Sequence, residues 1–325
     1  MARILTGIQS TGTPHLGNIL GAIQPAVELS KKEENEAFFF IANLHSLTQI
    51  QDATTLQQNT LSVAASYLAF GLDPEKVTFY RQSDVPHVTE LTWYLNCYFP
   101  FSRLSLAHGF KDKQDVLSEI NAGLFDYPML MAADILAYDA ELIPVGKDQL
   151  QHLEMARDVA SRFNHVHGET FVLPREFIQE SQMIIPGIDG NKMSKSRKNI
   201  ISIFSSDSEI KKQVMSIQTD SKGLEEPKNP DECIVYQIYK LICSPEQDQE
   251  MRENLLRGGY GYGHAKKELL RLILEKYQTQ RAIYQDYMAH PEKIEAILAE
   301  GAKKASVVSK AVINRVREKF GFKIL

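Results

Sequence analysis

Long apolar runs and cysteine are scarce in this chain. No stretch of 18 consecutive apolar residues occurs in its 325 residues, so we expect no transmembrane helix and no membrane partner. The first residues, MARILTGIQ, lack the apolar segment of a secretory signal peptide. Cys97, Cys233 and Cys243 are scattered and lack metal-ligand spacing. We therefore expect reduced thiols and a cytoplasmic protein.

Two common phosphate-binding patterns are also missing. Neither G-x-G-x-x-G nor G-x-x-x-x-G-K-[ST] occurs. The close pair His165 and His167 has no neighbouring cysteine, so we expect no structural metal. With 43% hydrophobic residues, however, the chain can form a large core.

Charge is unevenly distributed. The net charge is −5, yet the last 25 residues carry +6, so residues 1–300 sum to −11. The basic side chains of this tail are Lys303, Lys304, Lys310, Arg315, Arg317, Lys319 and Lys323. A solvated helix face and a polyanionic partner both account for such a bias.

The front half alternates between apolar strand patterns and helix patterns. Strands are predicted at residues 3–8, 37–42, 77–80 and 142–145. Helices are predicted at residues 18–34 (capped by Asn18 and kinked at Pro25), 54–70, 87–98, 128–138 and 149–163, with a charged helix or loop at 111–120. This alternation predicts an α/β fold with a doubly wound parallel sheet.

The rear part reads as helical. Helical periodicity covers residues 209–215, 232–242, 264–288 and 291–320, and no strand is predicted beyond residue 205. We therefore expect an α/β domain over residues 1–205 and an all-helical domain over 206–325. The last helix could pack back on the first domain.

A glycine-rich loop, GIQSTGTPHLGN, connects the first predicted strand to the first helix. In doubly wound sheets ligands lie beyond the carboxyl ends of strands, where helix N-termini favour phosphate. Gly12 and Gly17 would let a nucleotide approach the backbone, and His15 and Asn18 could donate hydrogen bonds. Taken alone, the loop is equally well explained as a structural turn.

A second loop carries cations. Gly187-Ile-Asp-Gly-Asn-Lys-Met-Ser-Lys-Ser196 places Lys192 and Lys195 three residues apart. Flexible cationic loops suit the transient binding of a pyrophosphate leaving group. A solvated loop would explain a single lysine pair as well.

Together the two loops resemble the HIGH and KMSKS signatures of class I aminoacyl-tRNA synthetases. They read His15-Leu16-Gly17-Asn18, which departs at its second and fourth positions, and Lys192-Met193-Ser194-Lys195-Ser196, which matches fully. The resemblance implies a Rossmann-type catalytic domain at residues 1–205, a tRNA anticodon-binding domain at 206–325, and catalytic roles for His15, Asn18, Lys192 and Lys195.

Within this class the chain resembles the tryptophanyl-tRNA synthetase family, most strongly at residues 7–12 with Gly17-Asn18, at 127–135, at 145–149 with Gln151-His152 and Arg157-Asp158, and at the lysine loop. The ATP-binding residues that the resemblance implies are Gln9, Ser10, Thr11, Gly17, Asn18, Gly146, Lys147, Asp148, Ile188, Lys192, Met193, Ser194, Lys195 and Ser196, with Lys111 or Lys113 reaching the phosphates. The implied tryptophan-binding residues are Asp134, Met131, Tyr127, Gln149, His45, Ile143 and Val145.

Asp134 lies in an otherwise apolar predicted helix. A carboxylate there is costly unless it is paired, or unless it faces solvent. The resemblance implies that it accepts the indole N–H of tryptophan. It could accept a phenol O–H as well, so a tyrosine-specific relative remains the alternative, whereas phenylalanine should be rejected by roughly 10⁴-fold or more.

The expected activity is the formation of tryptophanyl-adenylate from L-tryptophan and Mg²⁺-ATP, followed by transfer to tRNA(Trp), in a homodimer. A nucleotidyl-transferring enzyme without RNA and a non-catalytic RNA-binding paralogue are the rivals. Candidate RNA-contacting cations are Lys266, Lys267, Arg271, Lys276, Arg281 and the basic tail, and candidate stacking residues are Tyr260, Tyr262 and Tyr277.

Overall fold

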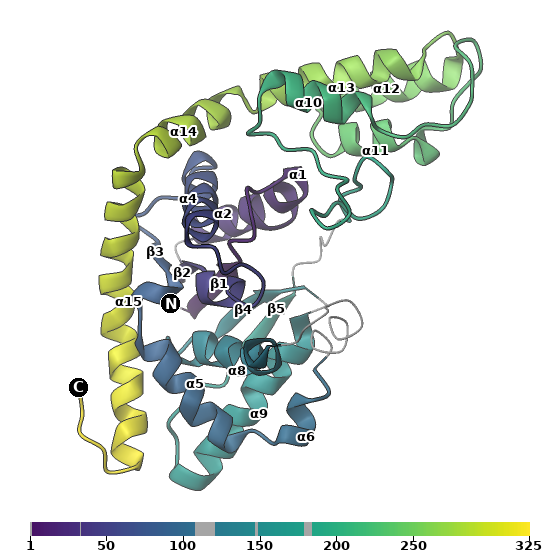
Figure 1. The fold of residues 1–325 in the computed structure, drawn as a ribbon. Helices are drawn as coiled ribbons and strands as arrows, with labels where there is room; N and C mark the ends of the chain where they lie inside the picture. Colours follow the sequence, from purple (N-terminus) through teal and green to yellow (C-terminus); the bar gives the residue numbers. More distant parts are fainter. Residues whose placement is uncertain (1, 33, 108–120, 147–148, 179–183) are drawn as a thin grey trace.

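The computed structural model describes residues 2–32, 34–107, 121–146, 149–178 and 184–325, without the side chains of Val145 and Ile178. Within these ranges one five-stranded parallel sheet has the order β3-β2-β1-β4-β5 (Figure 1). The strands are β1 (Ala2–Ile8), β2 (Asn35–Ile41), β3 (Thr78–Arg81), β4 (Leu142–Val145) and β5 (Arg175–Ile178). The predicted α/β fold with a helical C-terminal region is confirmed.

The sheet is buried on both faces. Along β2, Phe39 and Ile41 belong to one apolar cluster, whereas Phe38 and Phe40 belong to the other. Successive side chains of a strand point to opposite faces, which explains why this strand reads as a continuous apolar run. Because the strand order reverses between β1 and β4, their carboxyl ends border a crevice that suits a ligand.

The helices of the front part flank this sheet. They are α3 (Asn43–Ser46), α4 (Ala53–Ala69), α5 (His87–Tyr98), α6 (Phe101–Leu104), α8 (Ala122–Leu136) and α9 (Leu150–His167), with a 3₁₀ turn, η2 (Gln82–Asp84), after β3. The Asp52 and Asn121 side chains accept hydrogen bonds from Thr55 N–H and Leu124 N–H and cap α4 and α8.

The first helix differs from its prediction. It begins at Leu16 and runs through α1 (Leu16–Asn18), a π-helical segment η1 (Ile19–Ile23) and α2 (Gln24–Ser30). His15, not Asn18, is the residue before the first turn, and Asn18 Oδ1 accepts the His15 N–H at 3.2 Å. Pro25 follows the π-helical segment, a kind of irregularity that accommodates a missing backbone donor.

Strand β5 and the start of helix α8 also differ from the prediction. Strand β5 was missed because its four residues, Arg-Glu-Phe-Ile, carry two charged side chains and no clear alternation. Helix α8 begins at Ala122 rather than at Pro128, which lies inside it. Its Asn121 cap was the overlooked signal. The predicted segment 111–120 lies outside the described residues.

The rear part contains α10 (Asp207–Met215), η4 (Pro230–Glu232), α11 (Ile234–Lys240), α12 (Pro245–Arg257), α13 (Tyr262–Lys276) and α14 (Gln278–Ala289). The single helix predicted over residues 264–288 is two helices that meet at the buried Tyr277, and α12 was missed. Among the described helices, none has the length and apolar character needed to cross a membrane.

The last helix, α15 (Pro291–Lys319), lies along the edge strand β3 and contacts α4 and α5 (Figure 1). Gly301 makes this close approach possible, because a Cβ atom there would lie 1.8 Å from the carbonyl oxygen of Phe79. A helix that covers an edge strand also protects it from pairing with other chains. The domain boundary at residue 205 stays a prediction, since α15 packs on the sheet of the first domain.

The contact at Gly301 predicts a sharp packing penalty. Gly301→Ala should lower the free energy of unfolding by about 1–3 kcal/mol, because the added methyl group meets rigid backbone. Denaturant unfolding monitored by circular dichroism measures this. Gly263→Ala in α13 is the matched control, because a methyl group there meets no atom within 4 Å and should cost nothing. Equal stability of the Gly301→Ala variant and the wild type would contradict the tight contact.

Candidate active site

A cavity of about 410 Å³ opens at the carboxyl ends of β1 and β4. Its volume falls in the range of about 300–1,000 Å³ that small-molecule sites occupy. The predicted site residues that line it are Gln9, His45, Tyr127, Met131, Asp134, Ile143, Gly146 and Gln149. Lys111, Lys113, Lys147, Asp148 and the side chain of Val145 lie outside the described part of the chain.

Asp134 projects from α8 and keeps only 2% of its surface exposed, so it does not face solvent. Its Oδ2 lies 2.8 Å from His45 Nε2, and Gln82 Nε2 lies 2.8 Å from both carboxylate oxygens. An ionised carboxylate can only accept, so both neighbours donate to it. Burial raises the pKa of the Asp134 carboxyl, and the hydrogen bonds from His45 and Gln82 oppose that shift.

Gln82 is a site residue that the sequence analysis missed. It is fully buried at the start of the turn η2. Its Oε1 accepts the Leu44 N–H at 3.1 Å, which turns the amide NH₂ group toward Asp134. Its position directly after the carboxyl end of a predicted strand was the available signal.

Tyr127, which also lines the cavity, brings a further pair of polar groups to the site. The Tyr127 hydroxyl lies 2.8 Å from His152 Nε2, and the rings of Tyr127 and His45 meet edge to face with centroids 6.2 Å apart. His152 was not predicted as a site residue, although it lies within the segment that carries the resemblance. Met131 and Ile143 supply apolar wall between these polar groups.

The glycine-rich opening loop is fixed to the residues after β2. The Ser10 N–H donates to Ser46 Oγ at 3.0 Å, and the two hydroxyls lie 3.1 Å apart. His15 is buried, and its Nδ1 has no hydrogen-bond partner among the described residues. Burial first, and then the charge of Lys195, lowers the pKa of the His15 imidazole to about 4. His15 is therefore neutral near pH 7 and serves as a hydrogen-bonding group rather than as a cation.

The two predicted signature loops touch each other. The Gly17 N–H donates to Met193 Sδ at 3.3 Å, and Lys195 Nζ lies 2.9 Å from the position of a Cβ atom on Gly12. Gly12 has a φ of 124°, a conformation that glycine adopts without strain. Burial lowers the pKa of the Lys195 ammonium to about 8, whereas the Lys192 side chain is exposed. The contact places a poorly hydrated cation beside the opening loop.

Asn199 shapes the lysine loop and was not predicted. This buried residue accepts the Ser194 N–H at 2.7 Å, and its Nδ2 donates to Asp189 Oδ1 at 2.7 Å and to the Lys192 carbonyl at 3.1 Å. Its own carbonyl accepts the N–H of Ile188, whose carbonyl in turn accepts the Gln218 N–H. The loop is thus closed on itself and tied to the chain after α10.

The arrangement suits binding and charge stabilisation. A small-molecule cavity with a buried acceptor adjoins backbone donors, a neutral histidine and a lysine that gains from meeting an anion. No group of three or more His, Cys, Asp or Glu residues that could hold a metal ion occurs in the described residues. The roles predicted for Thr11, Asn18, Ser194 and Ser196 stay predictions.

The sheet order and the two loops define the catalytic domain of a class I aminoacyl-tRNA synthetase, and the model of the family "tRNA synthetases class I (W and Y)" matches residues 1–278. The chain is 44% identical to a tryptophan--tRNA ligase of Rhodopirellula baltica (99% of this chain, 100% of the relative) and 46% identical to that of Fusobacterium nucleatum (99% and 98%). A crystal structure of the Campylobacter jejuni tryptophanyl-tRNA synthetase complexed with ADP and tryptophan superposes with a TM-score of 0.94 at 42% identity, over 98% of this chain and 100% of that one. The chain belongs to the tryptophan--tRNA ligase family.

The burial of Lys195 predicts its titration. In protein labelled with ¹³C at lysine Cε, one resonance should titrate with a midpoint of about 8, because burial disfavours the charged form. Lys195→Arg should remove this resonance, and added pyrophosphate should raise its midpoint, because an anion stabilises the ammonium. A Lys195 resonance with the same midpoint as the exposed lysines, and with no change of midpoint on addition of pyrophosphate, would contradict a buried lysine that binds anions.

Proposed function

We propose that this chain activates L-tryptophan with ATP to form tryptophanyl-adenylate and transfers the tryptophanyl group to the 3′ end of tRNA(Trp). The observation that carries the proposal is the buried, doubly hydrogen-bonded Asp134 in a cavity beside two phosphate-binding loops. The similarity to tryptophan--tRNA ligases over nearly the whole chain supports the same activity. The homodimeric state remains a proposal that rests on the family resemblance, and the cytoplasmic location remains one that rests on the scattered cysteines.

In the amino-acid site, Asp134 accepts the indole N–H, since a carboxylate oxygen retains lone pairs beside those used by His45 and Gln82. Met131 and Ile143 form apolar walls against the indole ring. Tyr127 and Gln149 bind the ammonium group. Phenylalanine offers no donor to the acceptor site that His45 and Gln82 leave on the buried carboxylate, and this loss supplies the discrimination.

In the first step, a carboxylate oxygen of tryptophan attacks the α-phosphorus of ATP, the bond to the bridging oxygen breaks and pyrophosphate leaves. Backbone N–H groups of the opening loop and the neutral His15 bind phosphate oxygens, and Lys195 and Lys192 stabilise the charge that accumulates on the leaving group. Mg²⁺ arrives with ATP on its phosphates. The Asp189 carboxylate of the lysine loop accepts hydrogen bonds from Asn199 and Asn191, and the loops otherwise present donors and cations, which fits a metal carried by the substrate.

In the second step, the terminal ribose hydroxyl of the tRNA attacks the activated carbonyl, and AMP leaves. Neither step needs a covalent enzyme intermediate. The chain contributes positioning of the reacting groups and stabilisation of charge.

Tryptophan-dependent exchange of pyrophosphate into ATP tests the proposal directly. The purified chain should catalyse exchange with tryptophan and far less with tyrosine. Exchange that prefers tyrosine would favour the tyrosine-specific alternative, and its absence with every amino acid would favour a non-catalytic paralogue. Exchange without charging of tRNA(Trp) would favour an enzyme that acts without RNA.

Removal of the buried acceptor should weaken recognition of tryptophan alone. Asp134→Ala should lower kcat/KM for tryptophan by about 10²-fold, the loss expected for a buried hydrogen bond to a charged group. Its KM for ATP should stay near the wild-type value, because the phosphate loops do not contact this side chain. Exchange kinetics at varied tryptophan and varied ATP separate the two effects. Unchanged kcat/KM and unchanged discrimination against phenylalanine would refute the role of Asp134.

At least six of the twelve predicted RNA-binding cations bind other groups of the protein. Arg315 binds Asp139, and Arg317 binds Glu90. Four others contact protein groups: Lys266 the Met215 carbonyl, Arg271 Glu268 and Glu275, Lys276 the Ile242 carbonyl, and Arg281 Asp207. Tyr277 is 1% exposed, so it cannot stack on RNA in this conformation. Lys303, Lys304 and Lys310 remain exposed on α15.

These exposed lysines carry the proposal for tRNA affinity. Replacement of Lys303, Lys304 and Lys310 by Gln should raise KM for tRNA and reduce the slope of log affinity against log salt by about 2, since each lost phosphate contact removes about 0.7. Pyrophosphate exchange should not change, because it involves no RNA. Lys31→Gln with Lys32→Gln, on the exposed end of α2, is the matched control. Unaffected charging at physiological salt would mean that the tail is a solvated face.

A further inference from the structure

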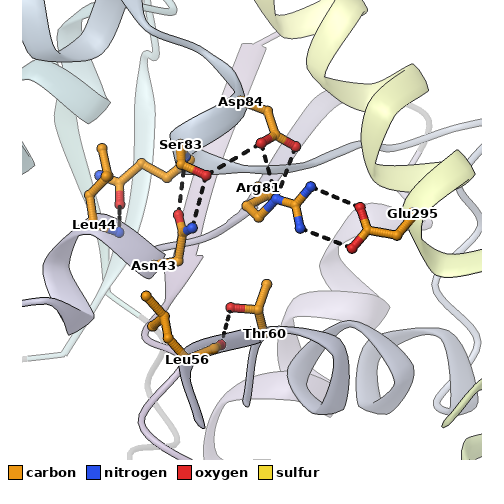
Figure 2. A network of polar contacts seen from close by, with 9 residues as sticks. Asn43, Leu44, Leu56, Thr60, Arg81, Ser83, Asp84 and Glu295 are labelled. Atoms are coloured by element: carbon orange, nitrogen blue, oxygen red, sulfur yellow. Dashed lines mark hydrogen bonds and ion pairs between the residues drawn. The ribbon is translucent and has the colours of Figure 1, made fainter. Parts of the chain in front are cut away.

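The turn η2 lies between the amino-acid cavity and the last helix. Figure 2 shows the Arg81 guanidinium between two carboxylates, those of Asp84 in the same turn and Glu295 in α15. Arg81 Nε lies 3.0 Å from both oxygens of Asp84, and Nη1 and Nη2 donate to the two oxygens of Glu295 at 3.0 and 2.8 Å. Arg81, directly before the turn, therefore binds α15, and Asp84, at the end of the turn, is linked to α15 through Arg81.

The inner side of the same turn supports the amino-acid site. Gln82 donates to Asp134, and the next residue, Ser83, exchanges two hydrogen bonds with Asn43 of α3, at 3.0 and 2.9 Å. Two residues further along α3 is His45, the other donor to Asp134. The two supports of the buried carboxylate therefore belong to segments that are bonded to each other and, through Arg81, to α15 (Figure 2).

The ion pair is built to hold a position. A guanidinium that binds a carboxylate through two parallel N–H groups fixes direction as well as distance. The side chains of Arg81 and Glu295 are 21% and 38% exposed, so solvent screens them less than it screens a fully exposed pair. The position of Glu295 is itself fixed, because α15 lies against β3 at Gly301.

We propose that Glu295 is a positioning residue for amino-acid recognition, which acts through Arg81 and the turn η2 on Gln82 and so on Asp134. This inference rests on the proposed function. Loss of the Glu295 carboxylate leaves Arg81 bonded to Asp84 alone, and the turn loses its attachment to α15. The Gln82 amide is then held less firmly, and the carboxylate that receives the indole N–H is less well oriented. Among the described residues, the opening loop is bonded to Ser46 of α3, but neither signature loop is bonded to Glu295, Arg81 or Gln82.

The test separates the two substrates of the exchange reaction. Glu295→Gln should raise KM for tryptophan about fivefold, within the range of indirect coupling through packed side chains, and should leave kcat and KM for ATP within about twofold of the wild type. Glu90→Gln is the matched control. It breaks a similar two-bond pair between α15 and the front part, with Arg317 at 2.6 and 2.9 Å, that does not reach the turn η2.

Glu90→Gln should leave KM for tryptophan unchanged, although both variants should lose similar thermal stability. A second comparison uses Gln82→Ala: if Glu295 acts through Gln82, adding Glu295→Gln to this variant should cause no further rise in KM. Fully additive effects, or an unchanged KM in Glu295→Gln, would overturn the inference while the wild type still catalyses exchange. Absence of tryptophan-dependent exchange in the wild type would contradict the proposed function itself, and the inference with it.

Discussion

The carboxylate of Asp134, buried between apolar residues of α8 and the sheet, imposes conditions on the structure around it. An unpaired charge at this depth would cost several kcal/mol or would be neutralised by a proton. Donors must therefore reach it from elsewhere in the chain, and they come from His45, after β2, and Gln82, after β3. Because parallel strands end at one edge of the sheet, the strand order brings both donors to the same place. We propose that the acceptor capacity that these donors leave recognises the substrate.

The phosphate side of the site follows the opposite electrostatic logic. Burial lowers the pKa of His15 to about 4 and that of Lys195 to about 8. Both basic groups are therefore partly shielded from water, which disfavours their charged forms. An incoming polyanion offsets this effect. The contacts of Gly17 with Met193 and of Gly12 with Lys195 hold the opening loop and the lysine loop next to each other. The amino-acid side therefore presents a hydrogen-bond acceptor, and the phosphate side presents hydrogen-bond donors.

Much of the fold and part of the site could be predicted from the sequence, and particular residues show where prediction failed. The apolar run at residues 37–42 predicted strand β2, and the helical pattern at residues 54–70 predicted helix α4. The two signature loops and Asp134 could be identified because their residue types and spacing carry chemistry. Gln82 had only its place after a predicted strand as a signal, and Asn199 had none, because the role of an isolated amide depends on which carboxylate or backbone group the fold brings to it. The partners of Arg315 and Arg317 were hidden for the same reason, since each pairs with an acid more than 170 residues away.

The central claim is that the buried carboxylate recognises the indole N–H. A direct test replaces the atom in the substrate and leaves the protein intact. β-(3-Benzothienyl)alanine keeps the shape of tryptophan but has sulfur in place of the N–H group. Its kcat/KM in pyrophosphate exchange should fall below that of tryptophan by about 10⁴-fold, because its binding leaves Asp134 without its last donor. A kcat/KM within about tenfold of that for tryptophan would show that shape alone selects the amino acid, and would contradict the account.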